Sequence, residues 1–172
     1  MIRIGILGDI GSGKSYVAKN FGYPVFNADF EVGKLYKKDR KIFNSLQKIL
    51  PKYIRSFPVK KNEICNAILA NKTNLKKIVI IVHLEIKKKM NLFLKKNINK
   101  KGDILIFVQS KKLDIIKRLK DRKNLNLKLL KKFKDIQLPL DYKKKISQFV
   151  IKNNFTKKSV NINIKKILKD IL

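Results

Sequence analysis

The chain has 172 residues, 44% of them hydrophobic, and a formal net charge of +31, which together predict one globular domain with a core of its own. Its one cysteine, Cys65, excludes an internal disulfide, no apolar run approaches the ~20 residues of a membrane-spanning helix, and the sequence opens on a core strand rather than a signal peptide, so we expect a cytoplasmic monomer without a membrane partner. Lysines spread along the chain beside many asparagines and isoleucines are typical of an AT-rich coding sequence, which favours a solvated lysine surface over a dedicated nucleic-acid face.

A glycine-rich loop follows the apolar run 1–7, which predicts a buried parallel strand. The loop fits the spacing G-x-x-x-x-G-K-[ST], in which glycines let backbone N–H groups turn toward a polyphosphate at the start of a helix. Lys14 is expected to reach the β- and γ-phosphates, and Ser15 to offer a hydroxyl to a bridging Mg²⁺, its metal ligand. The predicted nucleotide-binding residues of this loop are Gly8, Asp9, Ile10, Gly11, Ser12, Gly13, Lys14 and Ser15.

Asp29 lies where a second strand is expected to become a helix. A short helix, 14–21, is ended by Gly22 and Pro24, and Val25-Phe26 predicts the second strand. Asp29 would then lie at the carboxyl edge of the sheet, where open α/β folds bind ligands. The same position suits an N-cap of the helix 30–36, and the two roles are compatible.

Helical periodicity predicts three helices, 39–50, 61–70 and 73–96, with Thr73 as a cap of the third. The third contains a β-branched run, 78–82, that is also compatible with a buried strand. Its apolar rhythm continues past His83, which favours a helix. His83 is the chain's one histidine, and on an amphipathic helix such a residue is more often a packed or solvated bystander than a catalyst.

Two arginines stand out in the second half of the chain. After a clear strand, 103–108, the next helix carries Arg118 and Arg122 one turn apart, so both guanidinium groups can reach one place. Arginine offers a planar fork to phosphate oxygens, although a surface salt-bridge role fits the same spacing.

The rest of the chain completes the α/β pattern. A basic, helical excursion at 124–147, with Pro139 at a helix start, suggests a lid. A last strand, 149–151, and a terminal helix, 161–172, follow. Strands that alternate with helices predict a parallel β-sheet flanked by helices.

In this order, the segments resemble the dephospho-coenzyme A kinases, P-loop kinases of the nucleoside-monophosphate-kinase type. The resemblance runs nearly end to end, and only the ordered set is specific because many NTPases share the phosphate loop. Phe26-Asn27-Ala28-Asp29 is similar to the family's Asp-Ala-Asp, and Ile81-Val82-His83 to its His-Pro element, with Leu84 for proline. The other elements are Ile4 through Ser15, Arg118-x3-Arg122, Gln137 and Ile151-Lys152-Asn153.

The resemblance implies an ATP-dependent kinase that uses Mg²⁺ and dephospho-coenzyme A and has helical acceptor-binding and lid regions. Asp29 would be the base at the ribose 3′-hydroxyl, and His83 would lie in the coenzyme-A-binding region. Arg118 and Arg122 would close on the ATP phosphates. Lys14, Asp29 and Arg118 are thus the predicted catalytic residues, and Arg122 and Asn153 join the nucleotide-binding set. The predicted regions are a core at 1–29, 103–123 and 148–172, an acceptor region at 30–102 and a lid at 124–147.

One element of the family has no counterpart in this sequence. The family carries a strand ending in an acidic Pro-Leu-Leu-aromatic-Glu element between the His-bearing helix and the strand at 104–108, where this chain has only 97–102. The missing strand would lie next to the phosphate-loop strand. We expect 73–96 to stay helical, the sheet to be narrower and catalysis to be weak; the alternative is that 78–82 fills the gap as a strand.

The first functional hypothesis is therefore phosphorylation of dephospho-coenzyme A by ATP, which yields coenzyme A and ADP. The alternatives are another small-molecule kinase, or a non-catalytic basic protein that binds nucleotides or nucleic acid.

Overall fold

A computed structural model describes residues 2–97, 102–121 and 126–172. The chain divides into two compact units, each described by itself. The sheet unit comprises Met1–Val25, Asn97–Leu125 and Ile136–Leu172, and the helical unit comprises Phe26–Lys96 and Asn126–Asp135.

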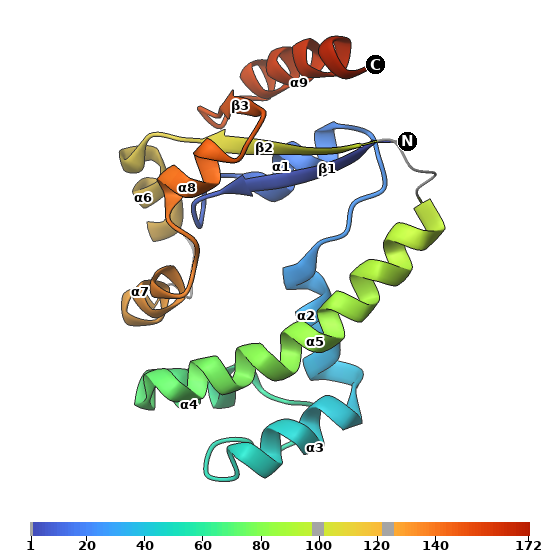
Figure 1. The fold of residues 1–172 in the computed structure, drawn as a ribbon. Coiled ribbons are helices and arrows are strands. Elements are labelled where there is room, and N and C mark those ends of the chain that lie inside the picture. The colour runs from blue at the N-terminus through green and yellow to red at the C-terminus, as the bar shows by residue number, and fades with distance from the viewer. Residues whose placement is uncertain (1, 98–101, 122–125) are drawn as a thin grey trace. The chain divides into compact units, whose positions relative to one another are not determined.

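The sheet unit is built on three parallel strands in the order β1-β2-β3 (Figure 1): β1 (Arg3–Gly8), β2 (Asp103–Gln109) and β3 (Phe149–Lys152). Ile4 pairs with Ile104 across β1 and β2, and Val108 with Ile151 across β2 and β3. Within the described residues β1 pairs with β2 alone and is therefore an edge strand. The predicted parallel sheet is confirmed, but the described residues form three of the four predicted strands, so the sheet is narrower than expected.

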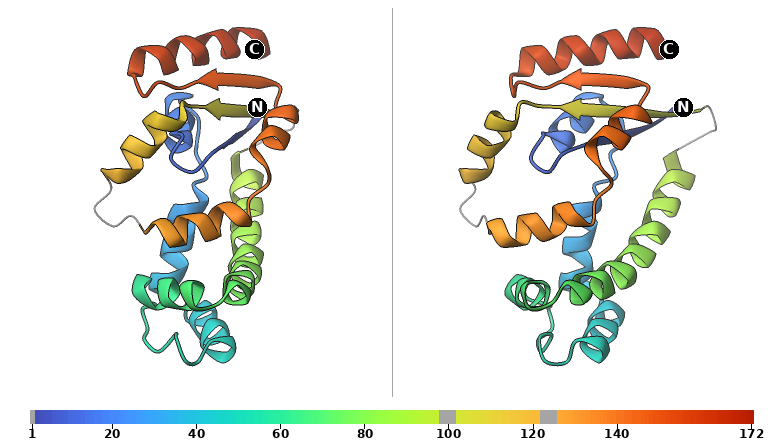
Figure 2. Two further views of the ribbon diagram at one scale, coloured as in Figure 1. Left: turned by 90° about the vertical axis from the view of Figure 1, so that its left-hand side faces the viewer. Right: turned by 60° about the vertical axis from the view of Figure 1, so that its left-hand side comes forward.

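Two helices form the main apolar core of the sheet unit. These are α1 (Lys14–Asn20) and α9 (Lys157–Ile171), and Figure 2 shows α9 lying along β3 in both views. Side chains from one face of the strands meet those of the two helices, because alternate residues of a strand point to one side. The buried members of this cluster are Val17, Phe21, Ile106, Val108, Ile151, Val160, Ile164 and Ile167. The unit also contains α6 (Lys112–Lys120) and α8 (Leu140–Lys145).

The helical unit has a separate apolar core. Its helices are α2 (Ala28–Lys38), α3 (Arg40–Ile49), α4 (Lys61–Ala70), α5 (Lys72–Asn97) and α7 (Leu127–Asp135). The run 78–82 is helical, as its continuing rhythm predicted, because Ile78 and Val82 lie one turn apart and are both buried in this core. No helix within the described ranges is long and apolar enough to cross a membrane.

The predicted strand at Val25-Phe26 is wrong. Residues 24–27 have no regular structure, and the ring of Phe26 packs instead against Phe93 of α5, with ring centroids 5.6 Å apart. Two apolar residues after Pro24 are too short a run to outweigh that aromatic contact.

The predicted N-caps of two helices are also wrong. Asn27 caps α2, since its side-chain oxygen accepts a hydrogen bond from Phe30 N at 3.1 Å, and Asp29 lies inside the first turn. At the start of α5, the Asn71 side chain accepts from Thr73 N at 2.9 Å, so Thr73 is not the cap. In both places an asparagine two positions earlier fills the role.

The segment predicted as a lid, 124–147, is shared between the units. Helix α7 joins the helical unit, where Lys132 Nζ donates to Ile68 O at 2.8 Å and Leu69 O at 3.1 Å near the carboxyl end of α4. A cation at that position suits the unpaired carbonyls of a helix end. Helix α8 belongs to the sheet unit.

Candidate functional site

The glycine-rich loop joins the end of β1 at Gly8 to the start of α1 at Lys14. Gly13 has φ 88°, a left-handed conformation, and a Cβ there would lie 2.4 Å from Asn153 Nδ2. A Cβ on Gly8 would lie 2.6 Å from Val108 O. Only glycine fits these two positions, because the loop runs this close to the ends of β2 and β3.

Ser12 lies at the centre of the loop and is fully buried. Its carbonyl oxygen accepts hydrogen bonds from Asn153 Nδ2 at 2.8 Å and from Ser110 Oγ at 3.1 Å. Its backbone N–H donates to Asp9 O at 3.2 Å. Its own hydroxyl finds no hydrogen-bond partner among the described residues. The backbone of Ser12, rather than its side chain, is therefore what the surrounding structure holds.

Lys14 folds back across the loop. Its ammonium group donates to Asp9 O at 2.6 Å and lies 3.4 Å from Gly8 O. The Asp9 carboxylate in turn accepts from Ile10 N at 2.6 Å. The cation thus lies over the loop carbonyls, within a side chain's reach of an anion bound by the loop.

The structure brings Arg118 to the same loop through an aromatic contact. The guanidinium carbon of Arg118 lies 4.7 Å from the centroid of the Phe155 ring, a cation–π geometry. Phe155 in turn borders the loop, 3.4 Å from where a Cβ of Gly13 would be. The side chain of Arg118 is exposed and can swing from this ring to a ligand. Arg122, predicted to act beside it, lies outside the described residues.

Asn153 follows β3 and is buried, with 3% of its surface exposed. Besides the bond from its Nδ2 to Ser12 O, its Oδ1 accepts from Phe155 N at 2.9 Å. Both ends of the amide are thus engaged by the protein. The predicted contact between Asn153 and a nucleotide stays a prediction, and its observed contacts are with the loop.

Lys143 of α8 is a buried cation that the sequence analysis missed. Only 8% of it is exposed, and its ammonium group donates to Gln137 Oε1 at 2.8 Å. Burial lowers the pKa of Lys143, and the negative charge of Asp9 in the loop partly opposes that shift. Gln137 was noticed in the sequence, but nothing distinguished Lys143 from the many lysines around it.

Asp29 and His83 lie in the helical unit, and both are exposed. Helices α2 and α5 are antiparallel there, since Glu31 pairs with Lys89 at 3.8 Å and Phe26 contacts Phe93. Asp29 therefore lies opposite residues 89–93, roughly 9–15 Å along α5 from His83. The structure does not bring these two predicted substrate-binding residues together.

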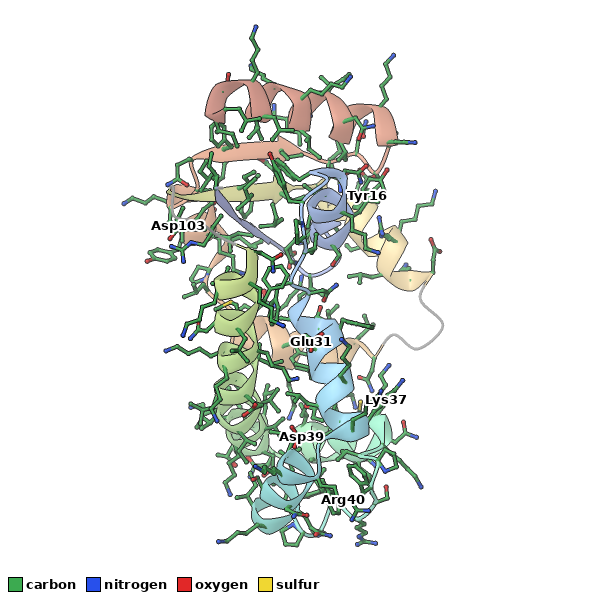
Figure 3. The ribbon with its side chains drawn as sticks, turned by 90° about the vertical axis from the view of Figure 1, so that its right-hand side faces the viewer. Tyr16, Glu31, Lys37, Asp39, Arg40 and Asp103 are labelled. Carbon is green, nitrogen blue, oxygen red and sulfur yellow. The ribbon has the colours of Figure 1, made fainter. Side chains whose placement is uncertain are left out.

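A basic hollow of about 920 Å³ lies between α5 and the junction of α2 with α3, where Figure 3 labels Asp39 and Arg40. Cations outnumber carboxylates along its walls, so an anion would be attracted to it. Its charged lining residues are Lys34, Lys38, Asp39, Arg40, Lys41, Glu85, Lys88 and Lys89.

The donor set of the loop fits a magnesium ion that a nucleotide brings with it. Within the described ranges no group of three histidine, cysteine, aspartate or glutamate side chains could hold a metal. Mg²⁺ in phosphoryl-transfer sites takes few protein ligands and keeps waters and phosphate oxygens. The exposed hydroxyl of Ser15, in the first turn of α1, is a suitable single ligand.

No family model matches the chain. Curated relatives named dephospho-CoA kinase align with part of it. The protein of Wolbachia sp. subsp. Brugia malayi (strain TRS) is 35% identical over 103 residues, 57% of this chain and 53% of the relative. That of Zymomonas mobilis subsp. mobilis is 28% identical over 100 residues, 56% of this chain and 51% of the relative. The chain spans about half the length of the curated relatives that it matches.

Two solved structures share the fold over nearly the whole chain. TT1252 from Thermus thermophilus superposes with a TM-score of 0.77 at 20% identity and covers 99% of this chain and 97% of that one. A dephospho-CoA kinase from Campylobacter jejuni gives 0.60 at 21% identity, with 99% and 98% covered. The predicted P-loop kinase fold is confirmed, as is the resemblance to dephospho-CoA kinases.

Proposed function

We propose that this chain transfers the γ-phosphoryl group of ATP to the ribose 3′-hydroxyl of dephospho-coenzyme A and releases coenzyme A and ADP. The observation that carries the proposal is the phosphate loop, with a left-handed Gly13, a tightly held Ser12 backbone and the Lys14 ammonium group lying across the loop carbonyls. Such a loop binds the phosphates of a nucleotide. The acceptor is proposed from the names of the relatives, about half of whose length this chain matches.

The residues of the chain divide the work of the reaction. Lys14 exchanges the carbonyls of Asp9 and Gly8 for the β- and γ-phosphate oxygens, and Arg118 turns from Phe155 to the same phosphates. Ser15 would hold Mg²⁺, which would supply further neutralisation of phosphate charge.

Asp29 is the proposed base. Its exposed carboxylate takes the proton of the 3′-hydroxyl as the hydroxyl oxygen attacks the γ-phosphorus. The bond from the γ-phosphorus to the bridging oxygen breaks, and that oxygen leaves with ADP. His83, on α5, is assigned to binding of the coenzyme A moiety.

The test measures ADP formation by the purified chain with ATP and Mg²⁺, with and without dephospho-coenzyme A. The proposal predicts ADP formation only with the acceptor, and a product that carries the new phosphate on the 3′-oxygen by mass spectrometry and phosphorus NMR. Transfer to another small molecule instead would favour a different kinase activity. Salt-sensitive RNA binding without any turnover would favour the non-catalytic alternative.

We also propose that turnover is slow and that the active species is a monomer. The resemblance implies an acidic element near the Mg²⁺ site, and this element has no counterpart in the sequence, so the site would lack one carboxylate. A kcat well below the 1–10³ s⁻¹ typical of enzymes is expected together with ordinary ATP affinity. A kcat inside that range would refute slow turnover. A dimer seen by light scattering would refute the monomer.

A further inference from the structure

We infer that Asn153 and Ser110 are positioning residues that fix the orientation of the Ser12–Gly13 peptide, so that the N–H of Gly13 faces bound phosphate. The inference deepens the proposed function and rests on it for the identity of the ligand. It concerns two side chains that need not contact the nucleotide. Their common target is the carbonyl oxygen of Ser12.

The contacts come from the carboxyl ends of two different strands. Ser110 directly follows β2, and Asn153 directly follows β3. Asn153 is itself anchored, because its backbone N–H donates to Gln109 O at 2.8 Å. The loop that follows β1 is therefore tied to the ends of both other strands of the sheet.

The hydrogen-bond network decides which end of the Asn153 amide faces Ser12. Phe155 N–H is a donor and needs the amide oxygen, at 2.9 Å, which leaves the amide nitrogen for Ser12 O. The opposite orientation would place two donors together and two acceptors together. The amide of Asn153 thus presents a donor to Ser12.

A planar trans peptide converts this anchoring into an orientation. The C=O and N–H of one peptide unit point in opposite directions, so holding Ser12 O inward turns Gly13 N–H outward. A flipped peptide would aim a carbonyl oxygen at the phosphates and replace attraction with repulsion. Position 13 must be glycine in this arrangement, since a Cβ there would lie 2.4 Å from Asn153 Nδ2.

The neighbouring asparagine offers a matched control. Asn153→Asp keeps the acceptor for Phe155 N and replaces the donor toward Ser12 O with an oxygen. Asn154→Asp adds the same charge one residue later, on an exposed side chain that among the described residues only accepts hydrogen bonds, from Thr156 N at 3.1 Å and Thr156 Oγ1 at 2.8 Å. The pair separates the loss of one donor from the gain of a negative charge.

Two readouts are needed, ATP affinity by calorimetry and the amide resonance of Gly13 in the free protein by ¹⁵N NMR. We expect Asn153→Asp to weaken ATP at least tenfold and to shift or broaden the Gly13 resonance, while Asn154→Asp changes ATP affinity less than threefold and leaves Gly13 in place. Ser110→Ala, which removes the second donor, should weaken ATP a few-fold and move the same resonance. This milder variant carries the test if Asn153→Asp does not fold.

The inference is overturned if a folded Asn153→Asp variant, or Ser110→Ala, keeps both the wild-type ATP affinity and the wild-type Gly13 resonance. A lower melting temperature with both readouts unchanged would mean a merely structural role and would also overturn it. If the wild-type chain binds ATP but does not phosphorylate dephospho-coenzyme A, the proposed function fails and the affinity comparison still decides the inference. If it binds no ATP, the Gly13 resonance decides.

Discussion

The sheet unit and the helical unit differ in where they bury polar groups. Of the four buried polar or charged residues in the described part of the chain, Ser12, Lys143 and Asn153 lie in the sheet unit, close to the phosphate loop. The helical unit buries only Asn74, which donates to Ala67 O at 2.9 Å. Buried polar groups are costly unless they are paired, and the Ser12 hydroxyl has no partner among the described residues, so the sheet unit gives up stability at its loop, whereas the helical unit is built mainly on apolar packing.

The proposed function places phosphate binding in the sheet unit and acceptor chemistry in the helical unit. Asp29→Asn tests the assignment with the largest expected effect. We expect turnover to fall about 10²–10⁴-fold, because the base is lost, with ATP affinity little changed because the loop is untouched. Steady-state kinetics and calorimetry on the same preparation measure both quantities.

The cap of α2 supplies the control for Asp29→Asn. Asn27 forms that cap, so Asn27→Ala should cost about 1 kcal/mol of stability without a comparable loss of turnover. Wild-type turnover in Asp29→Asn would remove the helical unit from the chemistry.

A second test uses alkaline pH, to which the helical unit should be sensitive. Burial and, to a smaller extent, the nearby Cys65 raise the pKa of Tyr36 from its ordinary 10.0 to about 12. The unfolded chain therefore loses this proton first. The stability from the neutral phenol is complete below pH 10 and is lost as pH rises toward 12, in total about 3 kcal/mol.

Chemical unfolding of the wild type and Tyr36→Phe across this pH range measures that loss. The variant should show a shallower decline, and parallel curves would contradict a buried phenol. Lys143 in the sheet unit should make the opposite contribution to stability, because burial lowers its pKa. The folded protein loses this proton before the unfolded chain does, so the contribution of Lys143 to stability increases as pH rises toward the ordinary pKa of lysine.

The third test concerns Glu63, whose carboxylate holds the loop before α4. Burial alone would raise the pKa of Glu63, but its carboxylate accepts hydrogen bonds from the N–H groups of Lys60, Arg55 and Ser56 and from the Ser56 hydroxyl, and together these lower it. The stabilisation is present above the ordinary pKa of glutamate and is lost as pH falls through the lowered value. Glu63→Gln should therefore cost about 1–3 kcal/mol at neutral pH and much less in acid.

Urea unfolding at the two pH values checks this expectation. Glu85→Gln is the matched control, because among the described residues Glu85 pairs only with the exposed Lys88, at 3.2 Å on the same helix, and such pairs contribute little. An equal loss of unfolding free energy in the two variants would mean that the hydrogen bonds of the Glu63 carboxylate do not stabilise the loop.

Sequence patterns within a single segment predicted the phosphate loop, one strand and helix α5. The phosphate loop has fixed spacing, the strand at 103–108 contains the uninterrupted apolar run 104–108, and the apolar periodicity that continues past His83 identified α5 as a helix. Where a residue's structure depends on a contact with a distant part of the sequence, the prediction failed or was not made. Phe26 packs against Phe93 instead of forming a strand, and the hydrogen bond from Asn153 to Ser12 joins residues 141 positions apart. Lys143 has no local signal because its neighbours are also lysines.

The most direct measurement of the central claim is ATP-dependent phosphorylation of dephospho-coenzyme A by Lys14→Ala beside Lys19→Ala. Both variants remove one ammonium group from α1, but Lys14 lies over the loop carbonyls, whereas Lys19 is exposed in the last turn. We expect Lys14→Ala to fold, to melt within a few degrees of the wild type and to show no measurable transfer, while Lys19→Ala keeps wild-type turnover. Wild-type turnover in Lys14→Ala would contradict the account of the phosphate loop.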